Sequence, residues 1–162
     1  MLLDVNRMGE RAESEEARPR WRVSLEIDLP VGSAFAGFCD VDRVGEWVPE
    51  VKVRAVLSRF PSGLVERVLL EGVIPGARVL FDVGCRYDAN RLRVSWESAL
   101  YDVHPIGGTV AFLPLGPRHC LMDFEMFEPA DSPGLPLPPL QVRMDRSRLV
   151  LQSFKRWAET RA

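Results

Sequence analysis

Three charged side chains stand out because their types and positions suit proton-transfer chemistry: Arg67, Asp123 and Glu125. The two carboxylates lie in "HCLMDFEMFEP", residues 119–129, which alternates as a β-strand does, so both occupy the same strand face. The opposite face carries apolar or sulfur-containing side chains: Cys120, Met122, Phe124 and Met126. If the carboxylates point inward, they could act as an acid and a base. If they point outward, the strand is an ordinary half-buried one.

Arg67 poses the same question on another predicted strand, where it lies between Val65 and Leu69 on one side. A guanidinium that faced inward would need a carboxylate or a ligand oxygen as its partner. The alternative is an outward arginine on a strand whose other face is buried. Both interpretations are compatible with the residues.

Motifs for nucleophilic catalysis and for nucleotide binding are missing from the sequence. Ser95 and Ser98 have no histidine nearby in the chain, and no Gly-x-Ser-x-Gly elbow occurs. No Gly-x-Gly-x-x-Gly fingerprint and no phosphate loop occur either. A hydrolase is therefore not expected, and neither a dinucleotide nor any other cofactor is implied.

Metal binding and disulfide bonding are also not expected. His104 and His119 have no second ligand at metal spacing, so we predict two loop histidines and no metal site. The cysteines Cys39, Cys85 and Cys120 are odd in number, far apart and surrounded by apolar residues. This pattern predicts reduced thiols in the core.

The size and the charge of the chain limit its class. With 162 residues, of which 46% are hydrophobic, it can form one domain with a substantial core. Its 21 basic and 23 acidic residues leave a formal net charge of −2, which argues against a nucleic-acid partner. Because no secretory signal and no run of about 20 apolar residues is present, we predict a cytoplasmic protein without an integral membrane segment.

The pattern along the chain predicts the elements that must position these side chains. The mixed-charge residues 1–19 are predicted to be a mobile N-terminal arm, followed by a folded domain over 20–162. "WRVSLEIDLP" alternates as a strand, and residues 30–49 suit two short helices. Six strands should follow, separated by turn signals near residues 60, 74, 87, 104 and 115. A proline-rich linker from residue 128 then leads to a long C-terminal helix.

This α+β order, together with several short segments, resembles the START-related polyketide cyclase/dehydrase family (SRPBCC) of the helix-grip superfamily. The segments are "IDLPVGSAF", "VDRVGEWVPEVKV", "LRVSWES", "GGTVAFLPLGP" and "FEP". The resemblance covers roughly residues 20–160 and implies a seven-stranded curved antiparallel sheet around the C-terminal helix. It also implies a cavity for a hydrophobic small molecule between that helix and the sheet. Its motifs are structural, so they specify the fold better than the function.

Several side chains become candidates for lining such a cavity: Trp47, Phe81, Tyr87, Trp96, Phe112, Phe127, Leu151 and Phe154. Trp47 and Pro49 match the family's corner between the second helix and the second strand. We predict a mainly structural role for both, since the large ring can seal one end of the sheet and the proline can fix the turn.

The resemblance also bears on the strand with the two carboxylates. In the resembling proteins, the aromatic residue two positions before the closing proline belongs to the inner face. Here that residue is Phe127, so the alternation would place Asp123 and Glu125 inside, with Arg67 as a candidate partner. The opposite face, with Met122, Phe124 and Met126, would then form an outer apolar patch suited to a homodimer or another partner.

Three functions remain open from the sequence. The favoured one is binding or carrying a hydrophobic small molecule such as a lipid, a quinone or a polyketide. The second is a polyketide cyclase/dehydratase, in which Arg67 would hold an enolate or carbonyl oxygen and Asp123 or Glu125 would move protons. The third is a protein-interaction module that uses the outer face of the sheet.

Overall fold

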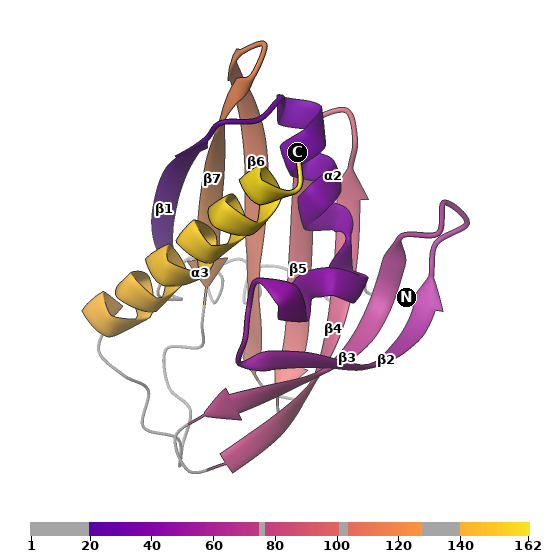
Figure 1. Ribbon diagram of the computed structural model, residues 1–162. Helices are drawn as coiled ribbons and strands as arrows, with labels where there is room; N and C mark the ends of the chain where they lie inside the picture. The colour runs from indigo at the N-terminus through magenta and orange to yellow at the C-terminus, as the bar shows by residue number, and fades with distance from the viewer. Residues whose placement is uncertain (1–19, 75–76, 101–103, 128–139) are drawn as a thin grey trace, which may run out of the picture.

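The computed structural model describes residues 20–74, 77–100, 104–127 and 140–162. Along the chain its elements are β1 (Arg20–Ile27), α2 (Val31–Cys39), the 3-10 helix η1 (Val41–Glu46), β2 (Val51–Arg59), β3 (Val65–Ile74), β4 (Ala77–Asp88), β5 (Arg93–Leu100), β6 (His104–Gly116), β7 (His119–Phe127) and α3 (Leu140–Thr160) (Figure 1). The predicted order of elements is confirmed. The turn predicted at residue 104 is wrong, because that residue begins β6. The predicted N-terminal arm and most of the proline-rich linker lie outside the described residues.

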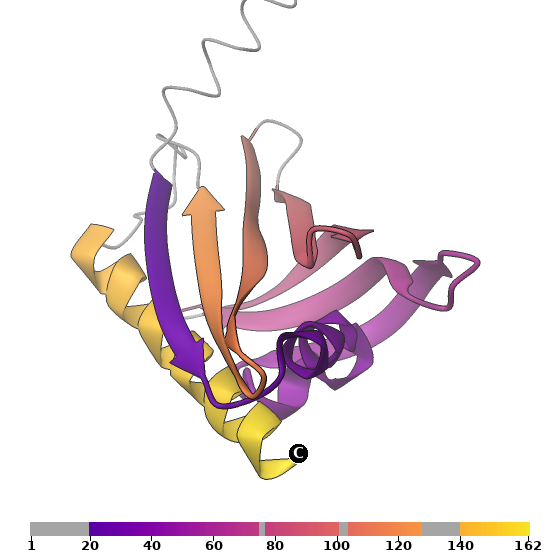
Figure 2. The same ribbon diagram turned by 90° about the horizontal axis from the view of Figure 1, so that it is seen from above.

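The strands form one antiparallel sheet in the order β1-β7-β6-β5-β4-β3-β2. The sheet is strongly curved, and α3 lies across its concave side over β1, while α2 packs on the same side against β6 and β7 (Figures 1 and 2). The predicted helix-grip architecture is therefore confirmed. Within the described residues, no helix is both long enough and apolar enough to cross a bilayer.

Buried and exposed side chains alternate along β1, because one face of the strand packs against α3 and the other faces solvent. Trp21, Val23 and Ile27 are buried towards α3, and the Trp21 Nε1 donates a 2.9 Å hydrogen bond to the Ser147 hydroxyl on that helix. Arg22, between the first two, faces solvent. A strand with one face against a helix and one in water is the pattern that the sequence predicts.

The pairing of β1 with β7 decides which way β7 faces. Val23 lies opposite Phe124 and Leu25 lies opposite Met122, so these β7 side chains share the inner face with the buried residues of β1. Cys120 and Met122 have no exposed surface, and Phe124 is 6% exposed. The predicted outer patch of Met122, Phe124 and Met126 is therefore wrong, and it offers no surface for a homodimer.

The carboxylates of β7 lie on the outer face, so the prediction that Asp123 and Glu125 enter a cavity is also wrong. Asp123 accepts hydrogen bonds from Arg22 Nε at 2.7 Å and from the Ser24 hydroxyl at 3.0 Å. Glu125 pairs with Arg20 at 3.3 Å. The physical reason is that burying the four side chains of the other face is favourable, whereas burying two carboxylates would cost desolvation free energy.

The centre of the core lies between α3 and the sheet. Phe154 of α3 has no exposed surface, and its ring packs against Trp47 at 5.0 Å, Phe38 at 5.2 Å and Phe112 at 6.4 Å between ring centroids. Leu151, one helical turn earlier, is 1% exposed. A side chain without accessible surface has no water-sized space beside it, so this part of the concave side is filled by the protein itself.

The three cysteines are buried and unpaired, as predicted. Burial raises the pKa of the Cys39 thiol to about 12, and it raises the pKa values of Cys85 and Cys120 as well. All three remain thiols near neutral pH and behave as small apolar core residues.

His119, at the start of β7, is tied to two carboxylates of the β1 end. Its Nδ1 lies 2.9 Å from Asp28 Oδ1, and its Nε2 lies 2.9 Å from Glu26 Oε2. Both ring nitrogens can donate only when the imidazole is protonated. The hydrogen bond to Glu26, and after it the one to Asp28, raises the pKa of His119.

The stability of the fold should therefore depend on pH through His119. A pKa raised by folding gives stabilisation that is fully present below the unfolded value of about 6.5 and is lost as pH rises through the folded pKa. Urea unfolding at pH 5.5 and at pH 8.5 should show a smaller drop between the two conditions for His119→Gln than for the wild type. The effect should be modest because solvent screens this site. Equal drops for both proteins would contradict the expectation.

Candidate functional site

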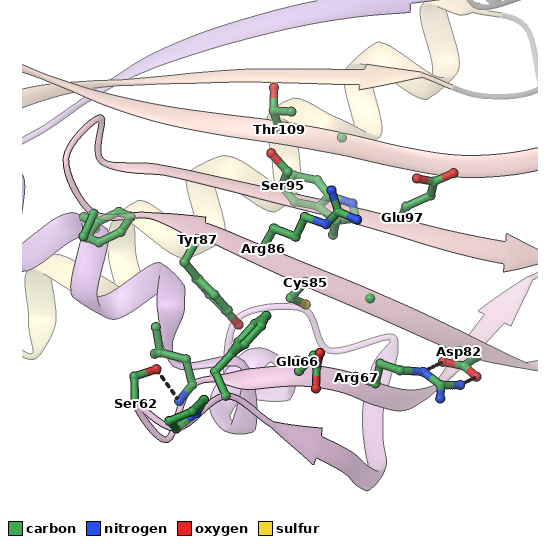
Figure 3. A pocket seen from close by; sticks show the side chains of 18 of the residues that line it. Ser62, Glu66, Arg67, Asp82, Cys85, Arg86, Tyr87, Ser95, Glu97 and Thr109 are labelled. Atoms are coloured by element: carbon green, nitrogen blue, oxygen red, sulfur yellow. Dashed lines mark hydrogen bonds and ion pairs between the residues drawn. The ribbon is translucent and has the colours of Figure 1, made fainter. Parts of the chain in front are cut away.

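The sheet opens between β3 and β4. The pairing of these strands runs from Ile74 opposite Ala77 to Arg67 opposite Gly84 and ends there, although β4 continues to Asp88 alongside β5. On its other side, β3 pairs Arg67 with Ser58 and Val65 with Arg59 of β2. Glu66 is thus the extra residue of a β-bulge, a feature that bends a strand and redirects its side chains. The start of β3 consequently diverges from β4 (Figure 3).

One hydrogen bond spans this opening. The Tyr87 hydroxyl of β4 donates to the Val65 carbonyl of β3 at 2.8 Å, and the Phe60 ring lies edge-on against the Tyr87 ring at 6.2 Å between centroids. Burial raises the pKa of the Tyr87 phenol. The phenol is therefore protonated near neutral pH and can donate this hydrogen bond.

An open pocket of about 1450 Å³ lies at the opening and reaches both sides of the sheet. Its inner part is lined by aromatic and apolar side chains, among them Phe35, Phe60, Leu64, Tyr87 and Trp96. Its outer part is lined by polar side chains, among them Glu66, Arg86, Ser95, Glu97 and Thr109. Figure 3 shows Glu66 of β3 and Cys85 and Tyr87 of β4 between the two strands, with Arg86 also on β4, Ser95 on β5 and Thr109 on β6.

Two glycines of β6 determine where the rings beside the pocket lie. A Cβ on Gly108 would come within 2.6 Å of the Trp96 ring and within 2.7 Å of the Glu125 backbone oxygen. A Cβ on Gly107 would come within 2.6 Å of the Phe127 ring. The Trp96 ring therefore covers Gly108 on the inner face, while the Phe127 ring covers Gly107 on the outer face. The prediction that Phe127 belongs to the inner face is wrong, although its side chain does line the pocket.

Three charged side chains of the pocket differ from those on the rest of the outer face. Elsewhere this face carries ion pairs, such as Arg22 with Asp123 and Arg54 with Glu71, and Arg67 pairs with Asp82 at the pocket rim. Within the part of the chain that the structure describes, the side chains of three pocket residues have neither a hydrogen-bond nor an ion-pair partner. These are Glu66, Arg86 and Glu97. Unpaired groups beside a pocket are free to contact a ligand.

The structure brings together some of the residues predicted from the sequence and separates others. Tyr87, Trp96 and Phe127 line the pocket. Four others lie in the packed core outside it: Trp47, Phe112, Leu151 and Phe154. Phe81 is half-buried against Gly72 on β3.

Arg67 is exposed on the outer rim of the pocket and is held by Asp82, with 3.4 Å between Nε and Oδ1. The predicted grouping of Arg67 with Asp123 and Glu125 is therefore wrong, because each of the three has a different partner. Sequence reasoning missed Glu66, Arg86 and Glu97. These residues are distinguished only by lacking a hydrogen-bond or ion-pair partner beside a break in the sheet. That feature depends on how separate strands pair, so the sequence does not reveal it.

No family model and no curated protein matches the amino-acid sequence. Solved structures do match the fold. A START superfamily protein from Mycobacterium smegmatis has a TM-score of 0.75 at 18% sequence identity, over 88% of this chain and 99% of its own. The ZhuI aromatase/cyclase from Streptomyces sp. R1128 has a TM-score of 0.70 at 15% identity, over 89% of this chain and 95% of its own. Norcoclaurine synthase of Thalictrum flavum has a TM-score of 0.62 at 10% identity, over 90% of this chain and 98% of its own.

These likenesses agree with the topology described above. The chain has the helix-grip fold of START superfamily proteins and aromatase/cyclases, as the sequence resemblance predicts. At these identities the comparisons establish the fold alone, so the function must be argued from the site.

Proposed function

We propose that the protein binds a hydrophobic small molecule with a ring system in the pocket at the β3–β4 opening. The observation that carries the proposal is the aromatic inner wall, formed by Phe35, Phe60 and Trp96 where the pairing of the sheet ends. Flat rings packed against aromatic side chains gain dispersion and quadrupole interactions beyond the burial of area. Concave apolar pockets with a few polar groups are the usual form of small-molecule sites.

This site differs from the one that the sequence resemblance implies. The pocket lining contains none of the described residues of α3, and the face of α3 that meets the sheet is filled by Leu151 and Phe154. We therefore place the ligand at the far side of α2 from α3. The structural neighbours support the general idea, because one of them is an aromatase/cyclase and another was solved with a transition-state analogue.

Glu66 gives a specific reason to consider a second function, that of a polyketide cyclase/dehydratase. Its carboxylate lies in the pocket without a partner and could accept a proton from a carbon acid held against the aromatic wall. Turnover and binding can be separated by native mass spectrometry. A supplied polyketone that is recovered from the protein lighter by one water would indicate cyclisation with dehydration. Recovery with unchanged mass and unchanged chromatographic retention would indicate carriage, because cyclisation alone gives an isomer of the same mass.

Removing an aromatic ring from the pocket should weaken ligand binding. Phe60→Ala should lower the affinity for an environment-sensitive dye about fivefold or more, since losing roughly 1 kcal/mol of contact corresponds to that factor. Displacement of the dye by fatty acids, quinones and aromatic polyketides would then rank the ligand classes.

Phe81→Ala is the matched control, because Phe81 is also a half-buried phenylalanine of this region but lies outside the pocket lining. Its dye affinity should equal that of the wild type once both are folded. Equal affinities for all three proteins would argue against the proposed pocket.

A further inference from the structure

Two neighbouring rows of side chains cross the outer face of the sheet at the pocket. In the first row, Arg86 of β4 lies opposite Ser95 of β5, which lies opposite Thr109 of β6. In the second row, Glu97 of β5 lies between two glycines, Gly84 and Gly107. Neither glycine has a side chain, although the Phe127 ring covers Gly107. Glu97 and its diagonal neighbour Arg86 both line the pocket and are exposed on this face. Diagonal neighbours across two strands are about 7–8 Å apart at their Cα atoms.

The hydrogen-bonding capacities of these groups are complementary. The Arg86 guanidinium can only donate, and the Glu97 carboxylate can only accept. The hydroxyls of Ser95 and Thr109 can do both, although Thr109 already accepts from Arg93 at 3.3 Å. Arg86 and Glu97 do not pair with each other or with any other described side chain, whereas Arg67 and Asp82 on the same face do pair. A ligand group that satisfies both must offer an acceptor and a donor.

The charges of the pocket further restrict the chemical class of the ligand group. The unpaired charged groups of the pocket are one guanidinium, Arg86, and two carboxylates, Glu66 and Glu97. A ligand with a carboxylate or a phosphate would meet Arg86 but would also be repelled by two negative charges. An uncharged group avoids this repulsion and does not leave a desolvated charge.

We infer that the outer part of the pocket is a subsite for an uncharged carboxamide-type group, whose carbonyl accepts from Arg86 and whose N–H donates to Glu97. The carbonyl oxygen and the nitrogen of an amide are adjacent, so one such group can bridge a donor and an acceptor on diagonal strand positions. The inference rests on the proposed function, because the apolar part of the same ligand would occupy the aromatic inner part. It adds the chemical class of the polar end and the face of the sheet on which that end lies.

Four probes with one ring system test the subsite: 2-naphthamide, methyl 2-naphthoate, the 2-naphthoate anion and 2-methylnaphthalene. Their dissociation constants would be measured by tryptophan fluorescence or by calorimetry. For the wild type we expect the amide to bind about tenfold more tightly than 2-methylnaphthalene, as hydrogen bonds to charged groups allow. The ester should fall between them, and the anion should bind more weakly than the ester.

Arg86→Met and Glu97→Met should each remove most of the advantage of the amide while leaving the affinity for 2-methylnaphthalene unchanged. Glu97→Met should also strengthen binding of the naphthoate anion, because it removes a repelling charge. Arg91→Gln and Glu50→Gln are controls of the same charge change outside the pocket lining. Both control variants should bind the four probes in the same order of affinity as the wild type.

The outcomes distinguish failure of the carboxamide subsite from failure of the ring-binding pocket. Equal affinities for all four probes, or an amide advantage that survives both methionine variants, would overturn the carboxamide subsite and leave the ring-binding pocket intact. Tightest binding of the naphthoate anion would also overturn it, in favour of an acidic ligand. If none of the probes binds, the proposed function fails and the subsite fails with it.

Discussion

Replacing Trp47 with alanine is expected to lower the free energy of unfolding by about 3–5 kcal/mol. The side chain is 6% exposed, and its ring lies 5.3 Å from that of Phe38 and 5.0 Å from that of Phe154. The substitution would leave a cavity at the point where η1, α2 and α3 meet. Since a whole domain is stable by only about 5–15 kcal/mol, this loss would be a large share of the total.

A second substitution at the same position separates packing from hydrogen bonding. The Trp47 Nε1 is buried without a partner among the described residues, so Trp47→Phe removes an unsatisfied donor while keeping a ring. It should cost much less than Trp47→Ala. Both would be measured by urea unfolding, with Leu115→Ala as an exposed control.

The same experiment tests whether the corner is structural, as the sequence predicts. Trp47 does not line the pocket, so dye affinity per folded molecule should not change in either variant. Wild-type stability combined with lost affinity would instead make Trp47 a ligand-contacting residue.

The sequence predicts the architecture well because most of it follows from local patterns. The alternation of Trp21, Val23 and Ile27 defines β1, and the helical spacing of Leu151, Phe154 and Ala158 defines the buried face of α3. In both cases the pattern of neighbouring residues in the chain is enough to predict the element and its buried face. The resemblance to helix-grip proteins then arranges these elements in the correct order.

The pocket could not be predicted in this way, because it arises from relations between strands. The bulge at Glu66 exists only in the pairing of β3 with β2, and the break after Arg67 exists only in its pairing with β4. Neither leaves a mark in the sequence of β3 alone. The resemblance therefore predicts a cavity beside α3 with Phe112 among its walls, whereas Phe112 lies in the packed core.

The direction of β7 was mispredicted for a different reason. Its own hydrophobic pattern favours the observed direction, whereas the position that the resemblance transfers to Phe127 predicts the opposite one. The observed register with β1 agrees with the local pattern. A difference of one residue in register inverts every side chain of a strand, so such a transfer must be accurate to a single position.

Replacing Phe124 with aspartate is expected to prevent folding. The Phe124 ring is 6% exposed and packs against the Trp96 ring at 5.4 Å between centroids. The substitution removes a large apolar contact and buries a carboxylate with no cation provided for it. The combined cost should exceed about 5 kcal/mol, which is comparable with the whole stability of a typical domain. Circular dichroism and urea unfolding would detect the loss.

Asp123→Asn is the matched control on the adjacent residue of the same strand. Arg22, the main partner of Asp123, is largely exposed, so the substitution should cost less than about 1 kcal/mol. The hydrogen bond from Arg22 lowers the pKa of Asp123. Its stabilising contribution is therefore present above the unfolded value of about 3.9 and is lost as pH falls through the folded pKa, so the two proteins should converge in stability in acid. If Phe124→Asp folded normally while Asp123→Asn unfolded, the carboxylate face of β7 would have to be the buried one. The register of β1 with β7, and with it the outer face on which the carboxamide subsite lies, would then be incorrect.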